Sequence, residues 1–146
     1  MKQNMQLKFS RWLLNVSIWI RYKATYYEMK HYVKKTKRTD YVCHLKSIGY
    51  CDRNIGKSYT LVKLALKYDL PIVVRYQTDA RNLKDLEYKY FKSDKIKIET
   101  ICMNLDRRQC KYETLLIEEG FTEKELRKYL NNEQPLCKNI IGYINY

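Results

Sequence analysis

The sequence CDRNIGKSYTLVKLALKYDLPIVV, residues 51–74, carries the strongest structural signal in this chain. Its central part, SYTLVKLALKY (58–68), repeats apolar residues at the spacing of one helix face. The segment PIVVRY (71–76), which overlaps its end, is a short apolar run rich in β-branched residues, and such a run is typical of a buried strand. The stretch therefore predicts a loop, a helix and a strand, in that order.

Strands and helices continue to alternate on both sides of this stretch. Short runs of β-branched and apolar residues predict strands, and longer segments with helical spacing predict helices. One of these helices begins with Thr122 and has Glu125 three residues later, which is a capping-box pattern. The further strands are expected at 41–49, 95–101, 114–119 and 139–145, and the further helices at 80–91 and 121–130. This order predicts an α/β domain with a three-layer, mostly parallel sheet that has helices on both faces.

The first forty residues have a different texture. They contain ten Lys or Arg against two acidic residues, a net charge of +8, whereas residues 41–146 contain nineteen against fourteen, a net charge of +5. A long amphipathic helix is expected from about Ser10 to Lys37. Its predicted apolar stripe consists of Trp12, Leu13, Val16, Trp19, Ile20, Ala24 and Tyr27. The chain thus divides into a basic helical arm, residues 1–40, and the α/β domain, residues 41–146.

Three interpretations of the arm remain open. The helix could pack its aromatic stripe on the body or on a partner while its charges are solvated. It could bind DNA or RNA, since Lys and Arg neutralise phosphates and Tyr offers a stacking surface. It could also lie in a membrane interface, where Trp beside Lys and Arg is favourable. The residues for nucleic acid would be Lys34, Lys35, Lys37 and Arg38, with Tyr22, Tyr26, Tyr27 and Tyr32.

Composition favours a cytoplasmic protein. The apolar run WLLNVSIWI near the start has nine residues, interrupted by Asn15 and Ser17, which is far short of the ~20 that span a bilayer. No small-residue cleavage site follows it, so a secretory signal is not expected. The five cysteines are odd in number and lack the close pairs of a zinc or dithiol site, so we expect free thiols in a reducing compartment.

Residues 51–58 have the chemistry of a phosphate-binding loop. In such a loop, backbone N–H groups surround the phosphates, a Lys reaches the terminal phosphates and a Ser or Thr hydroxyl binds Mg²⁺. Gly56, Lys57 and Ser58 match the last three positions, whereas Cys51 stands where the first glycine is usual. The residues expected to bind nucleotide are Asp52, Arg53, Asn54, Ile55, Gly56, Lys57, Ser58 and Tyr59.

An acidic pair follows an apolar strand about sixty residues later, in Leu115-Leu116-Ile117-Glu118-Glu119. A nucleotide hydrolase needs one carboxylate near Mg²⁺ and a second one that positions and deprotonates water. Glu118 and Glu119 could supply both functions. The alternative interpretation is that the pair only marks the point where the chain reaches the surface.

Together these residues make 41–146 resemble a small P-loop NTPase core of the additional-strand type, with Walker A and Walker B motifs. The segment KIETICMNLDRRQCKYETLLIEEG (97–120) also resembles the region before Walker B in helicase-like and phage terminase-like ATPases. The resemblance implies ATP and Mg²⁺ as ligands, with Lys57 on phosphate, Ser58 and Glu118 near the metal, and Glu119 activating water. Walker B usually begins with Asp, and Glu118 is one methylene longer.

The resemblance implies a nucleoside triphosphate binding protein, with ATP the expected nucleotide. Its Mg²⁺-dependent hydrolysis would be slow or activated by a partner, and its setting would be the DNA metabolism of a phage or mobile element, in the host cytoplasm if phage-encoded. A homo-oligomer or a partner protein could supply the arginine that neutralises the transition state. Loose candidates within this chain are Arg75, Arg81, Arg107 and Arg108. The alternative is a non-catalytic nucleic-acid-binding or structural protein on a degenerate P-loop fold.

Overall fold

The computed structural model describes residues 2–39, 41–48, 56–100, 112–130 and 137–145. In chain order the elements are α1 (Lys2–Lys35), β1 (Cys43–Ile48), α2 (Lys57–Tyr68), β2 (Ile72–Val74), α3 (Gln77–Phe91), β3 (Ile98–Thr100), β4 (Thr114–Ile117), α4 (Glu123–Leu130) and β5 (Asn139–Asn145). Each helix and strand expected from the sequence is present. The bounds differ most for α1, which begins eight residues earlier than expected, and for β3, which is shorter.

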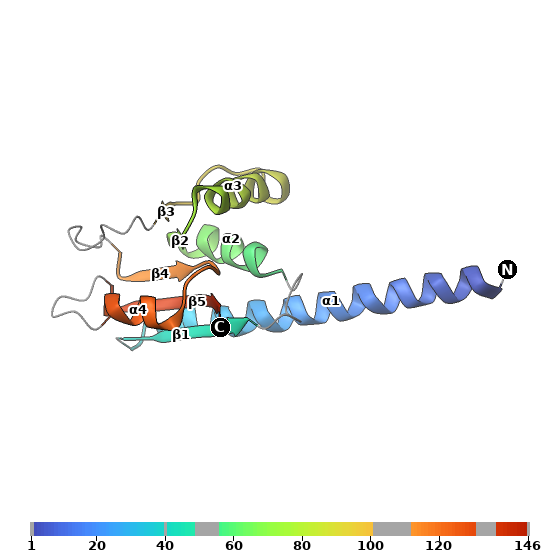
Figure 1. Cartoon of the computed structure of the whole chain (residues 1–146), viewed down its shortest axis with the longest axis horizontal. Coiled ribbons are helices and arrows are strands. Elements are labelled where there is room, and N and C mark those ends of the chain that lie inside the picture. The colour runs from blue at the N-terminus through green and yellow to red at the C-terminus, as the bar shows by residue number, and fades with distance from the viewer. Residues whose placement is uncertain (1, 40, 49–55, 101–111, 131–136, 146) are drawn as a thin grey trace.

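The strands form one five-stranded sheet in the order β1-β5-β4-β2-β3, and every pair in it is parallel. The prediction of a mostly parallel sheet is therefore confirmed. The last strand of the chain, β5, lies between β1 and β4 (Figure 1). Because all the strands run the same way, their carboxyl ends meet at one edge, where ligands of parallel sheets bind.

Helices cover both faces of the sheet, as the sequence predicted (Figure 1). On one face, Met29 of α1, Leu64 of α2 and Leu83 of α3 are buried in a single cluster with strand residues that include Ile141. On the other face, Leu126 of α4 packs in a second cluster, which includes Phe121, Ile117 and Ile140. The second half of α1 thus belongs to the same core as the sheet.

The predicted apolar stripe of α1 was wrong as the face that meets the body. Trp12, Trp19 and Tyr27 are 58%, 59% and 58% exposed, and Leu13 and Ile20 are exposed as well. The residues of α1 that are buried are Thr25, Tyr26, Met29 and Val33. At about 100° per residue these four lie on a different side of the helix from the stripe. The sheet is long enough to cover only the second half of α1, and the first half projects beyond it (Figure 1).

Along the described part of the chain, α1 included, no helix combines the length and the apolar character that crossing a bilayer requires.

The projecting half of α1 should contribute little to folding. Residues 5–21 are exposed except for the half-buried Val16, so we expect deletion of residues 1–20 to change the free energy of unfolding by less than about 1 kcal/mol. Met29 is fully buried, and Met29→Ala should cost about 2–5 kcal/mol. Urea denaturation of the two variants measures both values. A large loss on deletion would show that the projecting half supports the domain.

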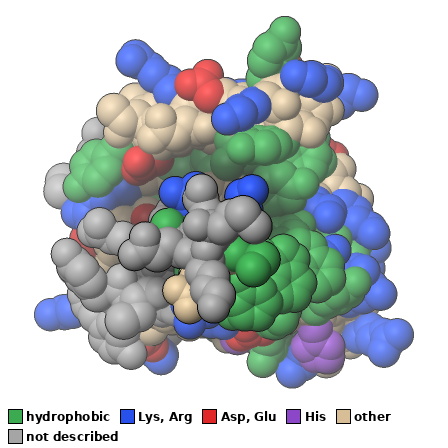
Figure 2. Space-filling model, turned by 90° about the vertical axis from the view of Figure 1, so that its right-hand side faces the viewer, with side chains coloured by type: hydrophobic (Ala, Val, Ile, Leu, Met, Phe, Trp, Pro, Cys, Tyr) green, Lys and Arg blue, Asp and Glu red, His purple; other side chains and the backbone are tan. Residues whose placement is uncertain are grey.

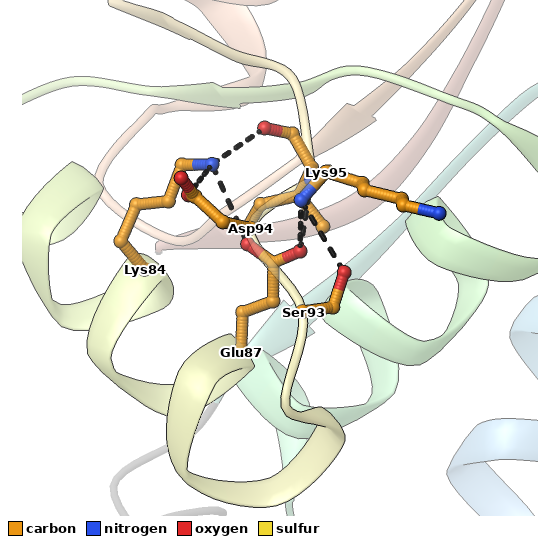
Figure 3. A network of polar contacts seen from close by, with 6 residues as sticks. Lys84, Glu87, Ser93, Asp94 and Lys95 are labelled. Carbon is orange, nitrogen blue, oxygen red and sulfur yellow. Dashed lines mark hydrogen bonds and ion pairs between the residues drawn. The ribbon is translucent and has the colours of Figure 1, made fainter.

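A buried carboxylate closes the connection between α3 and β3 (Figure 3). Glu87 is fully buried, and one of its oxygens accepts hydrogen bonds from the backbone N–H groups of Lys95 at 2.6 Å and Ile96 at 3.0 Å. Its other oxygen lies 3.4 Å from the ammonium group of Lys84, which also binds Asp94. Burial alone would raise the pKa of Glu87, but these hydrogen bonds outweigh it, so the pKa lies below its ordinary value.

Candidate functional site

The predicted phosphate loop leads directly into the first turn of α2. Gly56 precedes the helix with φ 72° and ψ 31°, the left-handed conformation that glycine adopts without steric cost. A Cβ atom at this position would lie 2.9 Å from Cδ2 of Tyr22, so the ring of an α1 residue also requires a glycine here. Lys57 and Ser58 follow in the first turn, where the backbone N–H groups have no acceptor within the helix. This end of α2 is therefore suited to an anion.

The acidic pair after β4 meets the start of α2. The hydroxyl of Ser58 donates a hydrogen bond to Oε1 of Glu118 at 2.7 Å. The ammonium group of Lys57 lies 2.5 Å from Oε2 of Glu119. The two sequence motifs, sixty residues apart, thus form one site at the carboxyl edge of the sheet. The motifs meet although the strands that precede them, β1 for the loop and β4 for the acidic pair, are not neighbours in the sheet, because β5 lies between them.

Glu118 has an unusual environment for a carboxylate. Its exposed fraction is 6%, and among the described residues its Oε2 atom has no hydrogen-bond partner. Burial raises the pKa of Glu118 to about 7; the charges of Glu119 and Asp79 add to this effect, and Ser58 and Lys57 oppose it. A carboxylate with one unsatisfied oxygen in such a place is costly unless a cation or donor joins it.

The donor set of this site fits Mg²⁺. The residues that would hold the ion are Ser58, through its hydroxyl, and Glu118, through the unsatisfied oxygen. In the described part of the chain no cluster of three or more His, Cys, Asp or Glu side chains could hold a metal by itself. Two protein oxygens are enough for Mg²⁺, because it keeps several waters and takes phosphate oxygens from its substrate.

The other residues expected in the loop are placed as follows. The ring of Tyr59 packs at 5.3 Å from that of Tyr22 and at 5.0 Å from that of Phe91, so its side chain belongs to an aromatic cluster between α1, α2 and α3. The remaining expected residues, Asp52, Arg53, Asn54 and Ile55, lie outside the described residues, as does Cys51.

The two arginine candidates that the structure describes, Arg75 and Arg81, form no hydrogen bond or ion pair with the Lys57, Ser58, Glu118 or Glu119 side chains. Arg75 donates a hydrogen bond to the backbone oxygen of Gly120 at 2.8 Å and pairs with Glu125, so it holds the turn that follows the acidic pair. Arg81 is exposed on α3. Arg107 and Arg108 lie outside the described residues.

The site also includes contacts that the sequence did not indicate. Tyr22 lies against Gly56, and Arg75 binds Gly120 next to the acidic pair. Asp79, in the first turn of α3, acts electrostatically on Glu118. None of these three pairs is indicated by a sequence motif, and the two residues of each pair lie far apart in the sequence. Only the packing of the helices on the sheet brings them together.

The basic cluster proposed for nucleic acid lies at the opposite end of the domain from this site. Lys34, Lys35, Lys37 and Arg38 are all exposed. The ammonium group of Lys37 is 5.6 Å from the ring centroid of Tyr68, at the last residue of α2, whereas Lys57 and Ser58 open the same helix. About 17 Å of helix separates the two ends. The basic cluster therefore does not form part of the candidate phosphate site.

Comparison of the chain with protein-family models, with curated protein sequences and with solved structures gives no match.

Proposed function

We propose that this protein binds a nucleoside triphosphate, with ATP the expected nucleotide, together with Mg²⁺ at the start of α2. The observation that carries the proposal is the contact of Ser58 with Glu118 at 2.7 Å, beside that of Lys57 with Glu119 at 2.5 Å. Each pair joins one residue of the loop motif to one residue of the acidic strand. A surface acidic pair would have no reason to meet this loop, so the contact favours the interpretation as a Walker A and Walker B site.

The sheet order is a second support. The strand that follows the acidic strand in sequence, β5, is inserted between β4 and the strand before the loop, β1. A strand inserted at this place is what the resemblance to the additional-strand type of P-loop NTPase implies. The sequence could not specify this order, so the agreement is independent of the motifs.

The side chains have complementary roles in this proposal. Without ligand, Lys57 and Glu119 neutralise each other. A triphosphate would attract Lys57, and Glu119 would then be free to orient and deprotonate a water molecule. Mg²⁺, when bound by Ser58 and Glu118, would neutralise charge on the phosphates.

We propose that hydrolysis is slow or depends on a partner. Glu118 is one methylene longer than the usual Asp, and no arginine side chain among the described residues forms a hydrogen bond or ion pair with Lys57, Ser58 or the acidic pair. An arginine from a second copy or from a partner protein would complete the site. The proposed setting is the DNA metabolism of a phage or mobile element.

Thermal denaturation with Mg·ATP tests the binding. At about 100 times the dissociation constant, ATP should stabilise the wild-type chain by about 2.7 kcal/mol. Lys57→Ala should lose this gain, because it removes the ammonium group that reaches the terminal phosphates. Lys67→Ala, an exposed lysine in the last turn of the same helix, is the matched control and should keep it. Failure of the wild type to respond, or an equal response of Lys57→Ala, would contradict nucleotide binding.

A phosphate-release assay on the same proteins separates an ATPase from a degenerate fold. Slow release that Glu119→Gln abolishes would support hydrolysis. If ATP stabilises the protein but no phosphate is released, with or without an added partner protein, the protein binds nucleotide without hydrolysing it.

A further inference from the structure

A row of lysines and aromatic rings follows α1 and α2, with Tyr26 buried in the core beneath it and other rings exposed. In every contact of the row an ammonium group lies within cation–π distance of a ring face. We call these residues the lysine–aromatic face. They are Trp19, Tyr22, Lys23, Tyr26, Tyr27, Lys30 and Lys37 from α1 and the turn after it, and Lys63, Lys67 and Tyr68 from α2.

Lys63 joins the two helices in this row. Its ammonium group is 4.6 Å from the ring centroid of Tyr26, and it donates a hydrogen bond to the hydroxyl of Tyr22 at 3.3 Å. On the same side, Lys30 lies 5.5 Å from the ring centroid of Tyr27 and 5.7 Å from that of Tyr26. The face is therefore built from two helices that are packed on one core, and its geometry is fixed by the fold.

Within the part of the chain that the structure describes, the lysines of the face have no acidic partner. None of the five forms an ion pair with a described carboxylate, whereas Lys57, Lys84 and Lys97 elsewhere in the domain each do. Burial raises the pKa of Tyr26; the charged group that opposes this is Lys63, and the other groups that act on it are tyrosines, with no carboxylate among them. A row of unneutralised ammonium groups on a chain of net charge +13 favours an anionic partner.

Two rings of the face are open to such a partner. Trp19 is 59% exposed with Lys23 at 5.3 Å, and Tyr27 is 58% exposed with Lys30 at 5.5 Å. Eight residues, about 12 Å of helix, separate the two rings. Figure 2 looks towards the projecting end of α1 and shows hydrophobic side chains with basic ones around them.

We propose that the lysine–aromatic face binds single-stranded DNA. Its ammonium groups would neutralise phosphates, and unpaired bases would stack on Trp19 and Tyr27. A second copy of the chain would bring lysines against lysines. A membrane helix keeps its charges and its apolar side apart, whereas here the ammonium groups lie over the rings.

We specify DNA because the side chains of the face are only lysines, tyrosines and one tryptophan. It contains no carboxylate or side-chain amide that would accept a hydrogen bond from the 2′-hydroxyl, the group by which a protein distinguishes RNA from DNA. The proposal does not depend on nucleotide binding, because its test contains no ATP.

Fluorescence anisotropy with labelled oligothymidine of about twenty nucleotides tests the proposal on the full chain. Binding should weaken between about 50 and about 200 mM salt. Lys30→Ala/Lys67→Ala should reduce the slope of log affinity against log salt by about 1.4, at ~0.7 for each phosphate contact. The matched control is Lys95→Ala/Lys124→Ala, which removes the same charge from exposed lysines after α3 and on α4 and should leave the slope unchanged.

Further measurements test base stacking and the competing partners, which are duplex DNA, RNA and membranes. Tyr27→Ala should weaken binding about tenfold without changing the salt slope, since it removes a stacking surface and no charge. A duplex of the same length should bind less tightly. The proposal is overturned by equal losses in the two lysine double variants, by tighter binding of oligouridine, or by binding to equimolar phosphatidylserine and phosphatidylcholine vesicles with none to oligothymidine.

Discussion

Replacing Gly142 with alanine is expected to destabilise the domain by about 3 kcal/mol or more, at or above the upper end of the usual range for overpacking. Gly142 lies in β5, an interior strand of the sheet, opposite Ile117 of β4. A Cβ atom at this position would lie 2.1 Å from the backbone oxygen of Ile117 and 2.7 Å from its nitrogen. Backbone atoms of a neighbouring strand cannot rotate away as a side chain can, so the strands would have to separate.

The change should also reach the candidate site. Ile117 immediately precedes Glu118, and a displaced β4 would carry the acidic pair away from α2. Urea denaturation and far-ultraviolet circular dichroism measure the loss. Ile144→Val, which removes one methylene from the same strand, is the control and should cost only about 0.5–1.5 kcal/mol. A Gly142→Ala variant as stable as this control would show that β4 and β5 tolerate a side chain between them.

The second large effect is expected for Glu87→Gln, at about 3 kcal/mol at neutral pH. The amide that replaces the carboxylate keeps its shape but removes its charge from Lys84. The NH₂ group of the amide cannot accept a hydrogen bond. It would face either the backbone N–H groups of Lys95 and Ile96 or the ammonium group of Lys84, all of which are donors. Because Glu87 is fully buried, solvent cannot replace these interactions.

This cost should depend on pH in a definite direction. The pKa of Glu87 is lowered in the folded chain, so its contribution is fully present above the pKa of the unfolded chain, about 4.5, and is lost as pH falls through the folded pKa. The difference in unfolding free energy between wild type and Glu87→Gln should therefore shrink below about pH 4.5.

Urea denaturation at several pH values gives this difference directly. The control is Glu123→Gln, which removes an exposed ion pair with Arg127 on α4 and should cost no more than about 0.5 kcal/mol. A Glu87→Gln cost that does not change with pH would show that folding does not lower the pKa of Glu87.

Much of the secondary structure can be predicted from short segments of the sequence. The 58–68 segment became α2 and 114–119 became β4, because helical spacing and β-branched runs are local properties of consecutive residues. Which face of α1 packs on the sheet could not be predicted in this way. Its aromatic stripe has a clear period, but the period does not say which side meets the sheet, and the core uses Tyr26, Met29 and Val33 instead.

For the candidate site, residue types and their spacing predict the chemistry. Gly56, Lys57, Ser58, Glu118 and Glu119 were identified from residue type and spacing, since a loop before a helix and an acidic strand end each have a local signature. Only the tertiary structure brought Ser58 to 2.7 Å from Glu118.

Only the tertiary structure, too, placed β5 between β1 and β4 and joined the lysines of α1 and α2 into one face. These contacts link residues dozens of positions apart. They depend on which strands pair and which helix faces are buried, and that outcome is set by the packing of the whole core and not by any one segment.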